Sequence, residues 1–146
     1  MMKLGWQIAI TVPLWIGLPN SMSWAQSIVP AADGTNTQVT FDGTDHTITG
    51  GATSADAQNL FHRFTEFNVL TGESATFLTD PAILNVFSGV SGATPSIIDG
   101  LLQVSGSNAN LFLVNPNGIL LGPNAALNLQ GSFNAVTADQ VNFAAG

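Results

Sequence analysis

The sequence predicts an all-β fold in which short strands stack as the turns of a solenoid, with a β cap at the N-terminal end. Beyond residue 75 the chain is a series of short apolar runs, and Gly, Pro, Asn or Asp lies near nearly every break. Asn followed by two apolar residues recurs at Asn85, Asn110 and Asn134, with spacings of 25 and 24 residues. Repeats of this length are typical of solenoids, whose turns bury their apolar faces against one another. We expect the three Asn side chains to bond to one another along the stack.

The composition indicates a folded, exported protein with an uncharged polar surface. Hydrophobic residues make up 45% of the chain and charged residues only 8%, against roughly 25% in ordinary soluble domains. Asn, Ser, Thr and Gln must therefore solubilise the surface. Apart from Lys3, Arg63 is the one basic residue against nine acidic ones, which excludes nucleic-acid binding. The chain has no cysteine, so no disulfide holds the fold.

The first 25 residues have the three parts of an export signal. Lys3 lies in a short positive start, residues 8–18 are apolar, and Ser23-Trp24-Ala25 is a small-x-small cleavage site. A membrane anchor is the alternative, but the apolar stretch is interrupted and shorter than the ~20 residues that span a bilayer. We expect cleavage between Ala25 and Gln26, which leaves residues 26–146 as the mature domain.

Residues 28–51 are expected to form half-exposed strands. Polar and apolar residues alternate in Thr37–Phe41 and His46–Thr49, and turn residues separate these stretches. Antiparallel strands at the start of a stack would cover its open end, which otherwise offers unpaired strand edges for aggregation. We therefore assign these residues to the cap.

Residues 53–67 fit either a helix or a strand. Thr53 followed by Asp56 resembles a helix capping box, and several apolar residues fall on one helical face. These residues are Ala57, Leu60, Phe61, Phe64 and Phe67. A strand over residues 59–69 fits equally well.

The stretch from Asn110 to Gly122 reads as strand, turn and strand. Leu111–Val114 and Ile119–Leu121 are continuous apolar runs, which predicts strands buried on both faces. Between them, Pro116 cannot donate a backbone hydrogen bond, and Asn117-Gly118 best tolerates a positive φ angle. Because the corner is wider than a two-residue hairpin, we expect a bend between neighbouring sheets.

No set of residues indicates catalysis or metal binding. The chain lacks a Gly-rich phosphate loop with a Lys, a Gly-x-Ser-x-Gly elbow and a Ser-x-x-Lys motif. His46 and His62 have no second His or Cys at metal-ligand spacing, so we expect hydrogen-bonded surface or cap histidines. Asp42 and Asp45 fit a turn better than a general acid and base or a calcium site. We expect no enzyme activity and no cofactor.

The corner also resembles a known sequence motif. Asn115-Pro116-Asn117-Gly118-Ile119 is similar to the NPNGI motif in the N-terminal secretion domain of the filamentous haemagglutinin family. The similarity extends from about Ile28 to Gly146, and within 53–67 it favours the strand. Further similar segments are Pro95–Val104, Gly122–Ala125 and Gly131–Phe133.

The resemblance implies a fold, a route and a partner. The fold would be a right-handed parallel β-helix, and the protein a two-partner-secretion (TpsA-type) exoprotein that is secreted or displayed on the cell surface. It would cross the periplasm of a Gram-negative-type cell unfolded and be recognised by the periplasmic POTRA domains of a TpsB outer-membrane transporter. Asn115 to Ile119 would then act either in that recognition or in folding.

Two other functions remain as alternatives. One is a surface adhesin that binds carbohydrate, the activity that gives the family its name. The other is a polysaccharide-active β-helix enzyme, which the lone Arg63 argues against. Domains of the family normally continue well past Gly146, some with a second Asn-Pro-Asn-Leu motif, so we expect a domain that is incomplete at its C-terminal end.

Overall fold

The computed structural model describes residues 27–139, which form thirteen strands and no helix. The strands are β1 (Ile28–Pro30), β2 (Thr37–Phe41), β3 (Asp45–Gly50), β4 (Ala52–Thr53), β5 (Asn59–Phe67), β6 (Ser74–Leu78), β7 (Asn85–Val90), β8 (Ser96–Ile98), β9 (Leu101–Ser105), β10 (Asn110–Val114), β11 (Ile119–Leu121), β12 (Ala126–Asn128) and β13 (Phe133–Val136). The predicted all-β class is confirmed. The predicted leader and its cleavage site at Ala25 and Gln26 lie outside the described residues and stay predictions.

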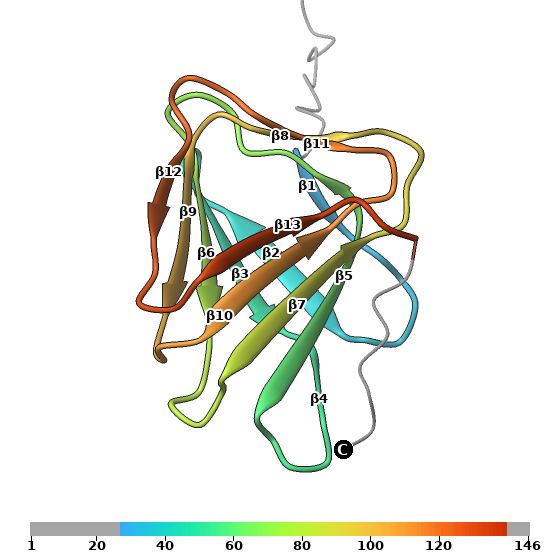
Figure 1. Ribbon diagram of the computed structural model, residues 1–146, viewed down its shortest axis with the longest axis vertical. Helices are drawn as coiled ribbons and strands as arrows, with labels where there is room; N and C mark the ends of the chain where they lie inside the picture. The colour runs from blue at the N-terminus through green and yellow to red at the C-terminus, as the bar shows by residue number, and fades with distance from the viewer. Residues whose placement is uncertain (1–26, 140–146) are drawn as a thin grey trace, which may run out of the picture.

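The strands form three sheets that the chain visits in turn. Sheet A has the order β1-β5-β7-β10-β13, with β4 paired to β5; sheet B has the order β12-β9-β6-β3-β2; sheet C pairs β11 with β8. From β7 onward the chain passes from A to C to B and then returns to A one level along the stack. Figure 1 shows β5, β7, β10 and β13 side by side in sheet A. The molecule is therefore a β-solenoid, as the sequence predicts.

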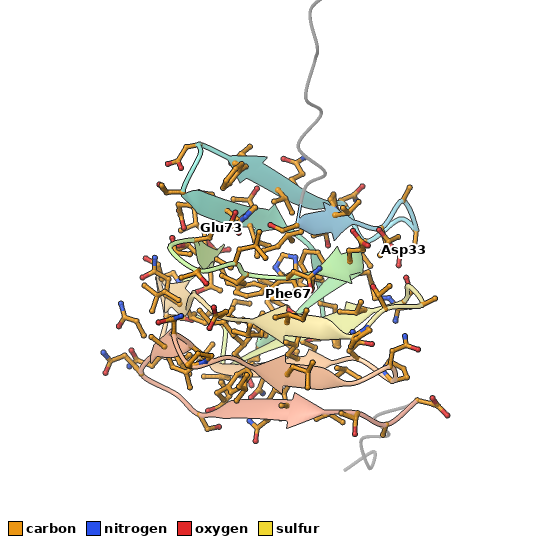
Figure 2. The ribbon with its side chains drawn as sticks, turned by 90° about the horizontal axis from the view of Figure 1, so that it is seen from above. Asp33, Phe67 and Glu73 are labelled. Atoms are coloured by element: carbon orange, nitrogen blue, oxygen red, sulfur yellow. The ribbon has the colours of Figure 1, made fainter. Side chains whose placement is uncertain are left out.

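Successive turns are joined by parallel pairing. In sheet A, Leu111 of β10 pairs with Val86 of β7 on one side and with Phe133 of β13 on the other. In sheet B, Leu102 of β9 pairs with Ala75 and with Leu127. Figure 2 shows the resulting layers from the cap to β13. Parallel in-register pairing puts equivalent residues of each turn in columns along the stack.

One such column is a ladder of Asn side chains, but its members differ from those predicted. Nδ2 of Asn85 donates to Oδ1 of Asn59 at 2.9 Å, and Nδ2 of Asn110 donates to Oδ1 of Asn85 at 3.0 Å. Asn134 pairs with Phe112 and not with Asn110, so its predicted place in the ladder is wrong. The last turn is shorter than the earlier ones, which moves Asn134 two residues out of register.

The N-terminal strands form the predicted cap. β2 and β3 pair as an antiparallel hairpin, and β3 continues sheet B in parallel with β6. β1 and β4 pair antiparallel with the two halves of β5. The first turn of the stack is therefore covered along sheets A and B.

Within residues 53–67, Asn59–Phe67 form strand β5 after a turn over residues 54–58, and the helical alternative is wrong. Ser54 and Asp56 form a turn in which Oδ1 of Asp56 accepts a hydrogen bond from the backbone N–H of Gln58 at 3.1 Å. In β5, Leu60, His62 and Phe64 are buried while Phe61 faces outward. Pairing with the neighbouring turn decides the conformation here, because tertiary contacts override a weak local helix preference.

The core fills the space between the three sheets. The rings of Phe64, Phe67 and Phe77 meet there, with the Phe64 and Phe67 centroids 5.0 Å apart, and Phe67 lies in the middle of the stack (Figure 2). Inward-facing aliphatic residues from the levels up to β10 complete it. They include Ile28, Ile48, Val69, Val86, Ile98, Leu102, Leu111 and Leu113.

The apolar run Leu111–Val114 predicts a strand buried on both faces, but β10 is buried on one face only. Leu111 and Leu113 point inward and are buried, whereas Phe112 faces outward and is half-buried. Its ring stacks on Phe87 at 4.7 Å. Leu120 in β11 is 58% exposed. The outer faces of a single-walled solenoid have no second layer, so apolar residues there pack only along their own column.

Candidate functional site

The candidate site is the corner Asn115–Ile119, which joins β10 in sheet A to β11 in sheet C. This is the bend between neighbouring sheets that the sequence predicts. The five residues of the motif are consecutive in the turn that follows β10; Pro116 and Asn117 are exposed and Asn115 is buried. Residues 92–96 of the preceding turn lie directly beneath them, as the contacts below show.

Asn115 is fully buried, and both polar atoms of its side chain form hydrogen bonds. Nδ2 donates to the backbone oxygen of Thr94 at 3.1 Å and to Oγ of Ser96 at 3.0 Å. Oδ1 accepts the backbone N–H of Asn117 at 2.9 Å, which forms an Asx turn. The backbone N–H of Asn115 also donates to the oxygen of Val136 at 2.9 Å, so this residue connects three turns of the stack.

Gly118 closes the corner in a conformation that favours glycine. Its φ angle is +115°, and its N–H donates to the backbone oxygen of Asn115 at 3.1 Å. Its own oxygen accepts the N–H of Ser96 at 3.0 Å, which starts the pairing of β11 with β8. Of the two residues predicted to tolerate a positive φ angle, only Gly118 adopts one.

Pro116 and Asn117 form the exposed tip of the corner. Asn117 still reaches the turn below, because its Nδ2 donates to the backbone oxygen of Gly92 at 2.6 Å. Ile119 is half-buried and packs against the core. The motif supplies amide hydrogen bonds and a shaped backbone, and none of its side chains can act as an acid, base or nucleophile at neutral pH.

Three partners of the motif could not be found in the sequence. The backbone oxygens of Gly92 and Thr94 accept hydrogen bonds from side chains of the motif. Ser96, which is fully buried, accepts one from Asn115 and donates its N–H to the oxygen of Gly118. Only their position about one repeat before the motif hinted at contact. The loop that contains Gly92 and Thr94 and leads to Ser96, the first residue of β8, is longer than the corner itself, so the register within it cannot be read from the spacing.

Both histidines are hydrogen-bonded, as expected, but neither lies on the surface. His62 is fully buried in β5 among Phe64 and Phe77, and its Nδ1 lies 3.3 Å from Oγ1 of Thr37. Burial lowers the pKa of His62 from 6.5 to about 4, because the interior disfavours the charged ring. His62 is therefore a neutral core residue at physiological pH.

His46 lies buried in the cap strand β3 and belongs to a small polar cluster. Its Nε2 lies 3.0 Å from Oγ of Ser27 and 3.1 Å from Oε2 of Glu73, which is labelled in Figure 2. Burial raises the pKa of Glu73, but hydrogen bonds from the N–H of Leu70, from His46 and from Ser27 outweigh it and lower that pKa overall. Ser27 and Glu73 meet the same ring nitrogen, so this is not the nucleophile, base and acid relay of a hydrolase, in which the acid binds the other nitrogen.

Asp42 lies in the predicted turn, and Asp45 closes that turn as the first residue of β3. Oδ1 of Asp42 accepts the backbone N–H groups of Thr44 and Asp45 at 2.9 Å and 2.8 Å, and these bonds lower its pKa. Asp45 bonds to hydroxyls of the next turn, with Oγ of Ser74 at 2.5 Å. Within residues 27–139 no three His, Asp or Glu side chains are grouped to hold a metal ion. The same residues include no helix long and apolar enough to cross a membrane.

Comparison with known proteins assigns the family. No curated protein sequence matches the chain. The model of the TPS secretion domain matches residues 25–146, which is most of the chain and includes every described strand. The solenoid, its cap and the Asn-Pro-Asn-Gly corner are all contained in the matched region. The chain belongs to the TPS secretion domain family, and it is the secretion domain of a two-partner-secretion exoprotein.

Proposed function

We propose that this domain directs export of its protein by binding, in the unfolded state, to the POTRA domains of a TpsB-type outer-membrane transporter. The leader is removed between Ala25 and Gln26 as the chain enters the periplasm, and the mature chain crosses the outer membrane and folds outside. No reaction is assigned to the domain. In this scheme the corner Asn115–Ile119 acts after transport, by locking the third turn of the stack onto the second.

The burial of Asn115 supports this division of roles. In the folded domain its amide is fully enclosed and bonded to Thr94, Ser96 and Asn117. A partner could reach that amide only by breaking the corner. A transporter that recognises the motif must therefore bind the chain before it folds. After folding, the same side chain forms hydrogen bonds between turns of the stack.

The absence of cysteine fits transport of an unfolded chain. The sequence has none, so no disulfide can form in an oxidising compartment and block threading. The stack is held by hydrogen bonds between turns and by apolar burial. Both can form after the chain has left the pore.

Secretion and binding of the same variants test the proposal. Asn115→Ala removes the buried amide, and Asn108→Ala is the matched control because Asn108 is exposed and its side chain forms no hydrogen bond within residues 27–139. We expect the unfolded Asn115→Ala chain to bind isolated POTRA domains like the parent chain, but to accumulate poorly outside the cell as folded protein. Asn108→Ala should match the parent in both assays.

Other outcomes would change the assignment. Loss of POTRA binding by Asn115→Ala would move the motif to recognition and contradict the folding role. Secretion that persists when the transporter is deleted would remove the export function altogether.

The adhesin alternative receives less support from the geometry. Its best surface would be the outer face of sheet A, where Phe61, Phe87 and Phe112 form a column. Their rings stack on one another at 5.3 Å and 4.7 Å, nearly parallel, so the ring faces lie within the column. Sugar recognition on aromatic residues uses ring faces, and we therefore place export first.

A further inference from the structure

The corner contains a chemically labile pair of residues. Asn117-Gly118 is the one Asn-Gly sequence in the chain. Glycine has no side chain to hinder its own backbone nitrogen, so that nitrogen can approach the preceding Asn side chain more easily than in any other Asn-x pair. Asn117 is also exposed, so water reaches it.

The reaction is loss of the Asn117 side-chain amide. The backbone nitrogen of Gly118, after giving up its proton to base, attacks Cγ of Asn117. A new C–N bond closes a succinimide ring, the Cγ–Nδ2 bond breaks, and Nδ2 leaves as ammonia. Water then opens the ring at either carbonyl, which yields aspartate or isoaspartate. The net change is the exchange of an amide for a carboxylate with consumption of one water.

The folded corner holds both reacting groups in other contacts. The N–H of Gly118 donates to the backbone oxygen of Asn115 at 3.1 Å, and Nδ2 of Asn117 donates to the oxygen of Gly92 at 2.6 Å. The backbone N–H of Asn117 is fixed by Oδ1 of Asn115 at 2.9 Å. Ring closure needs the Gly118 nitrogen to turn from its acceptor toward Cγ, which requires the corner to open.

We propose that Asn117 is a deamidation site that reacts in the unfolded chain and is protected once the corner has formed. The modification then records how long the chain has remained unfolded. The reaction needs only water and base, both supplied by the solvent. It depends on the local geometry and not on the export role proposed above.

Modification would also prevent the corner from forming properly. Aspartate at position 117 has no amide hydrogen to donate, so a carboxylate would face the oxygen of Gly92 in place of Nδ2. Isoaspartate would add a carbon to the backbone between Asn115 and Gly118, whose N–H and oxygen bonds fix the length of this turn. A chain that reacts before folding should therefore fold less well afterwards.

Peptide mapping by mass spectrometry tests the site and its protection. The chain is incubated at mildly alkaline pH either folded or in guanidinium chloride, and the amide-to-acid mass change is followed at every Asn. We expect residue 117 to react fastest in the unfolded chain and about tenfold or more slowly in the folded chain, since reaction then requires local opening. Equal rates in the two states would overturn the protection, and another Asn reacting faster in the unfolded chain would overturn the site.

Variants separate the chemistry from its structural effect. Gly118→Ala, measured only in the unfolded state, should slow the reaction at residue 117 because the added methyl group hinders the attacking nitrogen; an unchanged rate contradicts the mechanism. Asn117→Asp should refold with lower yield than Asn108→Asp, which makes the same charge change at an exposed Asn. Equal yields would overturn the structural consequence. None of these measurements involves a transporter, so their failure would leave the proposed export function standing.

Discussion

Two glycines with similar backbone angles show how the same residue meets different demands. Gly118 has a φ angle of +115° and Gly106 one of +105°. A Cβ atom on Gly118 would have only Cβ of Pro95 near it, at 3.7 Å, whereas on Gly106 it would lie 1.9 Å from the backbone oxygen of Thr79. Gly118 is needed for its conformation alone, and Gly106 also for the close approach of the neighbouring turn.

Replacing Gly118 or Gly106 with alanine should therefore destabilise the fold to different degrees. Gly118→Ala is expected to lower the free energy of unfolding by about 1–3 kcal/mol, the cost of holding a side chain in this region of φ and ψ. Gly106→Ala should cost clearly more, because the backbone of Thr79 must also move. Urea unfolding of both variants measures the difference, and an equal or reversed order would contradict the assignment.

His62 should make the free energy of unfolding depend on pH between 6.5 and about 4. Its pKa falls from 6.5 when unfolded to about 4 when folded, so the unfolded chain binds more protons between these values. Stability should therefore decrease as the pH falls from 6.5 toward 4, by about 3 kcal/mol for a shift of this size. The carboxyl groups whose pKa values are lowered, such as Asp42 and Asp99, add their own loss at lower pH.

A variant without the imidazole isolates this effect. His62→Gln should remove the part of the slope that lies between pH 6.5 and 4 in chemical unfolding measured at several pH values. The loss of stability at lower pH, which the carboxyl groups cause, should remain. A slope unchanged by the substitution would assign it to other groups.

At the scale of the strand, the two faces of β10 and β11 should respond differently to truncation. Leu113 is 1% exposed and Leu120 is 58% exposed. Leu113→Ala should cost about 2–5 kcal/mol through lost burial and a cavity. Leu120→Ala should change stability by no more than about 0.5 kcal/mol, as is usual at the surface. Comparable losses in denaturant unfolding would indicate that the outer face of sheet C is covered.

The strands and turns could be predicted because their signals are local. Alternation in Thr37–Phe41 gave the cap, and Pro116 with Asn117-Gly118 gave the corner between sheets. The period of the Asn residues gave the stack. The cap and the corner depend on residues close in the chain, and both are confirmed. The repeat is confirmed for the ladder members Asn85 and Asn110.

What could not be predicted depends on register between turns. The repeat predicts that Asn134 belongs to the ladder, but a shorter last turn pairs it with Phe112. The apolar run predicts a buried Phe112, because such a run does not show which of its members face a second layer. The partners of Asn115 could not be predicted for the same reason, since Thr94 lies in a loop of different length and Ser96 begins the strand after it.

At the scale of the whole molecule, each turn depends only on its neighbours. β7 pairs with β5 and β10, and β9 with β6 and β12, so no pairing beyond the cap skips a turn. A stack of this kind can grow from one end, with each turn templated by the one before. The cap, which precedes the regular turns in the chain, is the natural starting point.

Processing at the N-terminus is a prediction for the intact protein. Cleavage between Ala25 and Gln26 would leave Ser27 almost at the start of the mature chain, held by His46 and Glu73. Intact-mass measurement of the secreted protein should give a chain beginning at Gln26. Secreted material that retains Met1 would show that the leader is not removed.

The Asn ladder on sheet A affects how the protein responds to the medium around it. Asn59, Asn85 and Asn110 bond through amides that neither ionise nor attract counterions, and Asn128 bonds to Gln103 on sheet B in the same way. Dissolved ions weaken attraction between charges but have little effect on such bonds. A secreted protein meets salinity and acidity that its cell does not regulate, and these side-chain links between turns are insensitive to both.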